Sequence, residues 1–592
     1  MGIQNRSRTG FRRLLLTVML GFLLLLPLVC SLEFLSAVVP SKGVIKITPS
    51  GAVIGTDKIR QNGNVYTLAE DIMGDVATGS VFINIERDDI VFDGAGKTIR
   101  GTDSGIAIGV YGKNNVTIKN IRIIDFGTGI EMSFVTLTDS DNEMFFVDSS
   151  NSAIIDSYFE TRWGSIELRG VKHFVSGNTF IARNGLGAVF RSKETIFGNN
   201  KFIDCTLSYW EFDSSNIISD NTVNGKPLVI LEGQSNKIID GAGMVILINC
   251  TDMIIKNVDA SRLNNTSGFN YPIALFGINN SLITNCKGAI TISAHNSLII
   301  DNEFSRVGGT WQAAAMMLSG SNNTVTQNSI VGVNCCGLIV SGSHNYIEKN
   351  NIVASSNSGL DNIAGITLSG SRNYVYENVI SSEEIGLNLS GEYNIFCQNN
   401  VTLKHGRWNI YLNSAISNDI LGNNIQGSSE YAISLVSSDF NNFVWNNFRD
   451  NTKVNEVHET YWMTFTNSSY YAEYNKWDNG KEGNHWSDYN GQDTNGNGIG
   501  KTPYRVYGNF TDNYPLTQPY DISKIQVTFE KWDGSSIDLQ VHTDPQLHAD
   551  EVNVSKDFLI IAIAAVISVA IIAVVCVVFL WRFKNGSKTK VV

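Results

Sequence analysis

The sequence predicts an all-β protein, a parallel β-helix solenoid with capping regions that is followed by one C-terminal transmembrane helix. Three observations predict this fold. A short motif returns every 21 to 28 residues through much of the chain. Gly is abundant, with 53 residues, and Pro is scarce, with 9, which suits short strands joined by turns. Near the end of the chain, 24 consecutive residues carry no charge, enough to cross about 30 Å of hydrocarbon.

The repeated motif reads polar, any, apolar, two spacers, Asn, any, apolar. Clear copies are NTVTQNSI (323–330), NYIEKNNI (345–352) and NYVYENVI (373–380). Two apolar positions five residues apart do not share one face of a straight strand, whose side chains alternate with a period of two. They fit two short strands with a bend at the Asn, because Asn tolerates the left-handed backbone that a bend needs.

Stacked coil on coil, the bend asparagines predict an internal ladder in which each side-chain amide bonds its equivalents one coil away. The predicted ladder residues are Asn178, Asn200, Asn221, Asn302, Asn328, Asn350, Asn378, Asn399, Asn423 and Asn446. A leucine-rich repeat has a similar period, but it needs columns of Leu and a helical segment in each repeat. Val, Ile, Asn and Gly dominate here instead, which favours the β-helix.

The ends of the chain predict its topology. Four arginines precede the apolar run 14–29, as in a secretory signal, and Arg582 with three lysines follows the apolar run 558–581, which puts the C-terminus in the cytoplasm. We therefore expect a single-pass cell-membrane protein with an extracellular ectodomain. The predicted parts are a signal peptide (1–37), an N-terminal cap (38–87), β-helix repeats (88–448), a C-terminal cap (449–520), a juxtamembrane stalk (521–557), the transmembrane helix (558–581) and a cytoplasmic tail (582–592).

Charge and cysteine content narrow the function. A net charge of −12 without a basic cluster outside the ends is unsuited to nucleic acid. Between the two apolar segments the cysteines are too sparse for a disulfide scaffold, so one or two disulfides or plain burial are both open. They are Cys205, Cys250, Cys286, Cys335, Cys336 and Cys397.

Three stretches carry a family resemblance: NTVNGKPLVILEGQS (221–235), GAGMVILINCTDMIIKNV (241–258) and the ending NHWSDYNGQDTNGNGIGKTPY (484–504) with NYPL (513–516). Over about residues 88–520 the chain resembles NosD-type right-handed β-helix proteins, which include archaeal surface proteins with the carbohydrate-binding and sugar-hydrolase repeat. The bacterial member of that family is a periplasmic factor for copper delivery to nitrous oxide reductase. Fold does not decide function, so each implied activity has to be tested on the residues.

Copper favours clustered His, Met or Cys side chains. His295 and His344 each precede a repeat, but about two coils, roughly 10 Å, separate them. Two pairs of adjacent sulfur-containing residues, Met316–Met317 and Cys335–Cys336, lie about one coil apart. The sequence therefore does not support a copper site.

Polysaccharide chemistry and sugar binding are the other two hypotheses. Asp139, Asp141 and Glu143 alternate, so on a strand they would share one face as a cation site, a catalytic set or a solvated turn edge. For binding, the hypothesis places Tyr346 at the same repeat position as Tyr374, and Tyr376 at the same position as Trp445; stacked aromatics suit sugar rings and cross-strand pairing alike.

The segment DTNGNGIG (493–500) resembles a calcium loop. Asp493, Asn495, Asn497 and the Ile499 carbonyl match the first ligand positions of an EF-hand, but Tyr504 stands where a Glu is needed. Asp488 or Asp512 is a candidate for a missing oxygen. We predict a structural Ca²⁺ that supports the cap, with a metal-free turn as the alternative.

Taken together, these patterns favour a surface β-helix with a non-catalytic binding or cell-envelope role, directed toward polysaccharide or envelope glycans. The rivals are a polysaccharide-active lyase, hydrolase or epimerase and a NosD-like copper-handling factor. The sequence leaves the ligand and the oligomeric state open.

Overall fold

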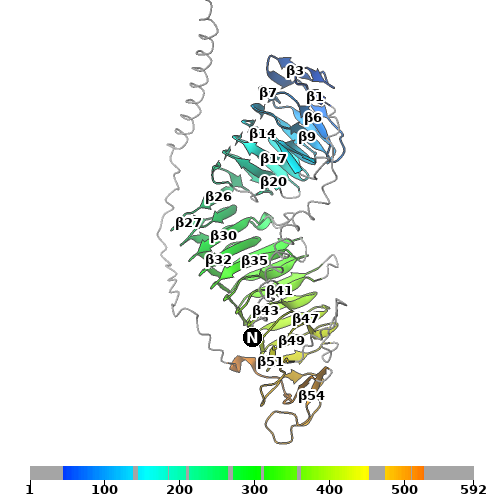
Figure 1. Cartoon of the computed structure of the whole chain (residues 1–592), viewed down its shortest axis with the longest axis vertical. Helices are drawn as coiled ribbons and strands as arrows, with labels where there is room; N and C mark the ends of the chain where they lie inside the picture. The colour runs from blue at the N-terminus through cyan, green and yellow to red at the C-terminus, as the bar shows by residue number, and fades with distance from the viewer. Residues whose placement is uncertain are drawn as a thin grey trace, which may run out of the picture. The chain divides into compact units, whose positions relative to one another are not determined.

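The computed structural model describes residues 45–137, 144–183, 186–208, 213–263, 271–308, 312–356, 362–451, 474–507 and 510–525. Almost all of its regular structure is strand, and successive coils stack in chain order (Figure 1). Each regular coil contributes one strand to each of three parallel sheets, which we call the first, second and third sheet in chain order. The prediction of an all-β protein with parallel sheets is confirmed.

The coils from residue 45 to residue 223 form an N-terminal segment. Its first sheet contains β1 (Ile45–Ile47), β6 (Val81–Ile85), β9 (Ile106–Val110), β12 (Thr128–Glu131), β17 (Gly164–Val171), β20 (Leu186–Lys193) and β23 (Thr206–Ser208). Its second sheet contains β4 (Val65–Leu68), β7 (Ile90–Asp93), β10 (Val116–Lys119), β15 (Ala153–Ile155), β18 (Phe174–Ser176), β21 (Ile196–Gly198) and β24 (Ile217–Ser219). Its third sheet contains β5 (Ile72–Met73), β8 (Thr98–Arg100), β11 (Arg122–Ile124), β16 (Tyr158–Thr161), β19 (Thr179–Ala182), β22 (Lys201–Ile203) and β25 (Thr222–Val223).

Parallel pairing starts earlier than residue 88, where the repeats were predicted to begin. β1 pairs with β6, and β4 pairs with β7, so the expected cap already contains coil strands. Two short antiparallel strands close this end, β2 (Val53–Ile54) on β1 and β3 (Ile59–Asn62) on β4. Their pairing covers strand edges that would otherwise expose unpaired backbone groups. An antiparallel hairpin, β13 (Ser133–Leu137) and β14 (Met144–Ser150), leaves the first sheet after β12.

A C-terminal segment continues from residue 226. Its first sheet contains β26 (Lys226–Glu232), β28 (Met244–Ile248), β30 (Ile273–Asn279), β32 (Ile290–His295), β35 (Ala314–Ser321), β38 (Cys336–Val340), β41 (Ala364–Leu368), β44 (Ile385–Leu389), β47 (Trp408–Asn413) and β50 (Tyr431–Val436). Its second sheet contains β27 (Ile238–Asp240), β29 (Ile254–Lys256), β31 (Leu282–Thr284), β33 (Leu298–Ile300), β36 (Thr324–Thr326), β39 (Tyr346–Glu348), β42 (Tyr374–Tyr376), β45 (Ile395–Cys397), β48 (Asp419–Leu421) and β51 (Asn442–Val444). Its third sheet contains β34 (Glu303–Val307), β37 (Ser329–Val333), β40 (Asn351–Ser355), β43 (Val379–Ser382), β46 (Asn400–Leu403), β49 (Asn424–Gln426), β52 (Asn447–Arg449) and β53 (His485–Trp486).

The two segments meet at a tight antiparallel turn between β25 and β26. Val223 pairs with Lys226 across Asn224 and Gly225, which have φ of 52° and 78°. Two successive left-handed residues are the signature of a hairpin turn that matches strand twist. Because of this turn, the third sheet of the N-terminal segment continues into the first sheet of the C-terminal segment.

The predicted bend asparagines are buried between the second and third sheets and form two runs, Asn178 to Asn221 in the N-terminal segment and a longer column from Asn302 to Asn446 in the C-terminal segment. Asn328 donates from Nδ2 to Oδ1 of Asn350 at 3.0 Å, and Asn350 donates to Asn378 at the same distance. The left-handed residue is the one before each asparagine, such as Lys349 with φ of 54°, and not the asparagine itself as the sequence suggested. The asparagine's role is to satisfy backbone groups at the bend, since Asn378 Nδ2 also donates to the carbonyls of Ile347 and Tyr376.

A second asparagine column lies between the first and second sheets of the C-terminal segment. Its members are buried and linked amide to amide in the same direction, and they are Asn323, Asn345, Asn373, Asn394, Asn418, Asn441 and Asn475. The repeated motif contains these residues at its first position, so the sequence held the signal.

The C-terminal cap closes the core with stacked aromatic rings. Trp477 lies 4.5 Å from Phe443, and Trp486 lies 4.5 Å from both Phe448 and Tyr504, measured between ring centroids. The first asparagine column ends here, because Asn446 donates to Asn484.

A buried carboxylate closes that column. The carboxylate of Asp512 accepts the backbone N–H of Asn484 at 2.7 Å and the indole N–H of Trp486 at 2.9 Å. The hairpin β54 (Tyr504–Tyr507) and β55 (Phe510–Asp512) supplies this group, and η2 (Ile522–Lys524) follows it, while η1 (Ser261–Leu263) is the other short 3₁₀ turn in the described ranges.

Several predicted features concern residues that the structure does not describe, namely the signal peptide (1–37), most of the stalk (521–557), the transmembrane helix (558–581) and the tail (582–592). Within the described ranges, no helix is long and apolar enough to cross a bilayer. The six cysteines between the two apolar segments are buried and form no disulfide within the described residues, so they pack as small apolar side chains.

Candidate functional site

A line of side chains follows the corners between the first and second sheets of the C-terminal segment; five of them are exposed, and His344 and Ser417 are half-buried. Each of its residues directly precedes a member of the second asparagine column, and we call the line the turn column: Asn322, His344, Arg372, Tyr393, Ser417, Phe440 and Tyr474. The first six have left-handed backbones, with φ between 56° and 59°. Side chains at these corners point away from the core.

Three members of the turn column are large aromatic residues that gain little from burial. Tyr393 and Phe440 are each 53% exposed, and Tyr474 is 59% exposed. A left-handed backbone costs about 1–2 kcal/mol for a residue other than Gly, Asn or Asp. An aromatic ring at such a corner leaves apolar surface in water, and contiguous exposed apolar side chains are typical of binding surfaces.

The rings are held in order along the stacking direction. Phe440 and Tyr474 stack with centroids 5.1 Å apart and planes 3° from parallel. The guanidinium carbon of Arg372 lies 5.5 Å from the centroid of the Tyr393 ring. Arg372 and Tyr474 therefore cover the outer faces of Tyr393 and Phe440, whose other faces turn toward the coil of Ser417. Two coil spacings, about 10 Å, separate these two rings.

The turn column from His344 onward lies within a segment that matches a known family. Residues 245–491, less than half of the chain, match the family described as "Periplasmic copper-binding protein (NosD)". The chain contains a NosD-like parallel β-helix. A search of curated proteins finds no match.

Solved structures similar to this NosD-like chain share little sequence with it. The Dettilon tailspike protein (gp208) aligns at 11% identity and a TM-score of 0.25, over 61% of this chain and 56% of its own. A mutant of the periplasmic alginate epimerase AlgG aligns at 9% identity and a TM-score of 0.22, over 64% of this chain and 77% of its own. The Azotobacter vinelandii mannuronan C-5 epimerase AlgE6 A-module aligns at 10% identity and a TM-score of 0.17, over 71% of this chain and 90% of its own. The chain thus spans just over half the length of the tailspike.

The soft ligands that a NosD-like protein would need for copper lie apart. His295 is level with Ser321, which bridges to Ser343 in the next coil, so two coils separate His295 from His344. Burial raises the pKa of Cys335 to about 12, which disfavours the thiolate that binds metals. Across the described ranges, no three His, Cys, Asp or Glu side chains group where they could hold a metal ion.

The calcium-loop-like segment is closed by its own backbone. Asp493 Oδ1 accepts the N–H of Gly496 at 2.7 Å, and Oδ2 accepts the N–H of Gly498 at 2.8 Å. These bonds hold the pKa of Asp493 below its ordinary value. Both oxygens therefore already have backbone donors, and the turn is stable as an Asx-type loop without a metal.

The other predicted calcium ligands are dispersed. Asn497 Oδ1 accepts the N–H of Ile499 at 3.0 Å, and Asp488 accepts the hydroxyl of Tyr504 at 2.9 Å. The side chain of Asn495 is exposed, and Asp512 is buried in the cap. Donor oxygens are present, but one carboxylate at the loop is a weak set for Ca²⁺, which prefers several. The calcium site stays a prediction.

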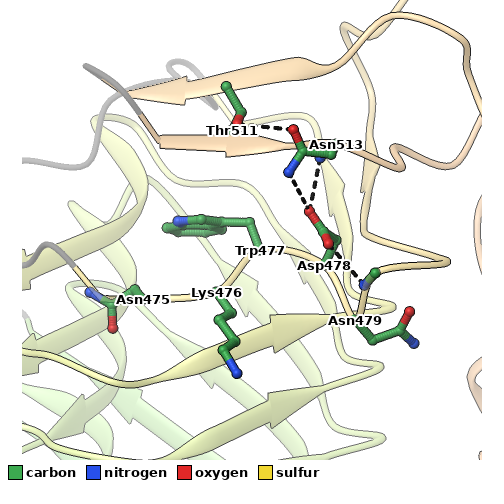
Figure 2. Close-up of a pocket in the computed structure, with 8 residues that line it drawn as sticks. Asn475, Lys476, Trp477, Asp478, Asn479, Thr511 and Asn513 are labelled. Carbon is green, nitrogen blue, oxygen red and sulfur yellow. Dashed lines mark hydrogen bonds between the residues drawn. The ribbon is translucent and has the colours of Figure 1, made fainter.

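A hollow of about 450 Å³ lies beside this loop region in the cap (Figure 2). Asp478 Oδ2 accepts both the N–H and the side-chain amide of Asn513, at 2.9 and 3.0 Å, which ties two wall segments together. Trp477 lines it but is only 2% exposed and stacks on Phe443. These contacts indicate a structural part of the cap.

The predicted acidic set Asp139, Asp141 and Glu143 lies outside the described residues. A different carboxylate pair is brought together on the first sheet of the N-terminal segment. Glu131 on β12 is the register partner of Glu167 on β17. The repeated triplets GIE (129–131) and SIE (165–167) were a signal for this pairing that the sequence analysis missed.

The two carboxylates differ in their surroundings. Glu131 accepts the hydroxyl of Tyr111 at 3.3 Å, and burial together with the charge of Glu167 raises its pKa to about 8. Glu167 lies 3.6 Å from Arg169 and 3.9 Å from Arg191, which favour its ionised form. The pair thus combines a carboxyl whose pKa is raised with one that lies beside two arginines.

The aromatic positions predicted within the second sheet are partly correct. Tyr346 and Tyr374 are register partners with centroids 5.1 Å apart, but both are half-buried. Placing Tyr376 with Trp445 was wrong, because Tyr376 pairs with Cys397 while Trp445 is the left-handed residue before Asn446.

Proposed function

We propose that the protein is a non-catalytic carbohydrate-binding protein of the cell surface, anchored by residues 558–581, which binds glycans on the turn column. One observation carries the proposal: three aromatic side chains occupy corners of the solenoid with more than half of their surface exposed. Aromatic faces suit the C–H faces of sugar rings, while a phenol hydroxyl offers a hydrogen bond at the rim.

The position of the turn column supports binding to an extended ligand. Its members recur once per coil, so they form a line along which a chain of sugar units can lie. The main-chain N–H groups of the corners bond carbonyls of the next coil, as from Arg372 to Glu392 at 3.0 Å and from Tyr393 to Ile416 at 3.2 Å, so the backbone is fixed while the aromatic side chains face solvent.

Isothermal titration of the full-length chain in detergent with a panel of oligosaccharides tests the proposal. Tyr393→Ala and Phe440→Ala should each weaken binding about tenfold, which corresponds to about 1.4 kcal/mol. Phe174→Ala is the matched control, because Phe174 is an exposed aromatic residue of the N-terminal segment, at 42% exposure. Equal losses for all three variants, or no binding of any glycan, would contradict the proposal.

A specific observation favours a second candidate, an enzyme that acts on polysaccharide. Glu131, whose pKa is raised, and Glu167, which lies beside two arginines, are register partners that suit the general acid and the partner carboxylate of glycoside hydrolysis. Release of reducing ends from polysaccharides measures this activity. An activity lost in Glu131→Gln and Glu167→Gln, but kept in the more exposed control Glu160→Gln, would replace the binding proposal by an enzymatic one.

A further inference from the structure

We propose that the turn column binds neutral sugar chains and discriminates against acidic ones such as uronates. The inference rests on the proposed function and adds the chemical class of the ligand. It comes from the charges that surround the two ring faces of Tyr393 and Phe440.

The three turns that bracket this position carry carboxylates. In the stretches 390–395, 413–419 and 436–442, all of them described, the charged side chains are Glu392, Asp419 and Asp439. Glu392 directly precedes Tyr393, and Asp439 directly precedes Phe440. Asp419 lies two residues beyond Ser417, in the coil between the two rings.

Two of these carboxylates are held in place. Asp439 Oδ1 accepts the backbone N–H of Tyr474 at 3.4 Å, which keeps it beside the Phe440–Tyr474 stack. Asp419 Oδ1 accepts the side-chain amide of Asn442 at 2.6 Å. Each has a second oxygen that can accept a hydroxyl of a bound sugar.

The nearest cations along the column lie outside this interval. Arg372 covers the far side of Tyr393, and Lys476 follows Tyr474 by two residues. A uronate bound between the rings would therefore meet turns that carry carboxylates and no cation, and like charges repel. A hydroxymethyl group in the same place carries no such penalty and donates a hydrogen bond.

The interval also has a size that fits sugar units. Two coil spacings, about 10 Å, leave room between the ring faces for roughly one or two pyranose rings above Ser417. Ser417 presents only a small, half-buried side chain between the two rings.

Matched pairs of hexasaccharides test the inference on the full-length chain. The pairs are β-1,4-glucan with glucuronan, β-1,4-mannan with mannuronan, and α-1,4-galactan with galacturonan, each differing in the carboxylate at C6. We expect the neutral member of at least one pair to bind at least tenfold more tightly than its uronate. We expect this binding to change little between 50 and 500 mM salt, since it involves no ion pair.

Variants identify the source of the discrimination. The double variant Asp419→Asn with Asp439→Asn should reduce the preference for the neutral member to threefold or less. Asp252→Asn is the control, because Asp252 is an exposed left-handed corner aspartate in another coil, with φ of 53°. Uronates that bind the wild-type chain as tightly as their neutral partners would overturn this inference but not the proposed function. No binding of any hexasaccharide would overturn both.

Discussion

Each ladder asparagine satisfies several backbone and side-chain groups at a place where sheet pairing is interrupted. Asn378 is fully buried, and its Oδ1 accepts both the backbone and side-chain N–H of Asn350. Its Nδ2 donates to Asn399 and to two carbonyls. Because buried polar groups without partners are costly, the bend depends on the amide and not only on the residue's size.

Asn378→Ala should lower the free energy of unfolding by roughly 3 kcal/mol, since it leaves several buried groups without partners. Urea denaturation followed by circular dichroism measures the loss. Asn400→Ala is the control, because Asn400 is the exposed neighbour of Asn399 and bonds one side chain, that of Asn424. We expect the control to change stability by less than about 0.5 kcal/mol, and equal losses would refute the ladder's role.

Glu131 predicts a pH dependence of stability. Its pKa is about 8 in the folded protein and near 4.5 when unfolded, so the folded state holds the proton more tightly. The stabilisation is full below about pH 4.5 and is lost as the pH rises through 8. Relative to Glu131→Gln, the free energy of unfolding of the wild-type chain should therefore fall as the pH rises from about 4.5 to about 8. The slope of this fall corresponds to at most about one more proton bound in the folded state than in the unfolded state. If the free energy of unfolding of the two proteins changed equally with pH across this range, the raised pKa of Glu131 would be contradicted.

At the scale of elements, the C-terminal cap acts through its stacked rings. Trp486 is 1% exposed and lies between Phe448 and Tyr504. It therefore continues the core beyond the last regular coil and shields the strand edges there from solvent.

Trp486→Ala should destabilise the cap by about 3–5 kcal/mol, because it leaves a large cavity. Hydrogen exchange should show faster exchange in β52 and β53 than in the distant strand β17, since coils of a solenoid depend mainly on their neighbours. Tyr514→Ala, at a 37% exposed position of the same cap, should leave the exchange unchanged. Uniform acceleration along the chain would show that the cap does not unfold locally.

Local sequence signals predicted the coils but not the turn that connects the N-terminal and C-terminal segments. The motif placed two strands on either side of Asn328, where β36 and β37 lie, because apolar spacing and bend chemistry agree within one coil. The shift of sheets at Asn224 was not predictable, because a two-residue turn does not reveal which distant sheet its strand will join. The pairing of Glu131 with Glu167 depends on register between coils 36 residues apart, and the exposure of Tyr393 depends on a corner before Asn394, where the sequence analysis placed no bend.

At the scale of the whole molecule, calcium remains a proposed support for the end of the solenoid. If Ca²⁺ binds at Asp493, millimolar Ca²⁺ should raise the melting temperature of the wild-type chain by several degrees, through binding to the folded state alone. Asp493→Ala should abolish this rise, while the control Asp259→Ala should keep it. An equal rise in both variants would place the ion elsewhere, and no rise in the wild type would leave the loop as a metal-free turn.

The asparagine columns run in one direction, since each amide donates toward the C-terminal end and receives from the coil before it. A whole coil inserted within one of the columns would accept and donate the same bonds as its neighbours, and the carboxylate of Asp512 would still accept the N–H of Asn484. The number of coils can therefore change during evolution without loss of the ladder hydrogen bonds. Duplication or loss of one repeat changes the length of the solenoid while both of its ends keep their chemistry.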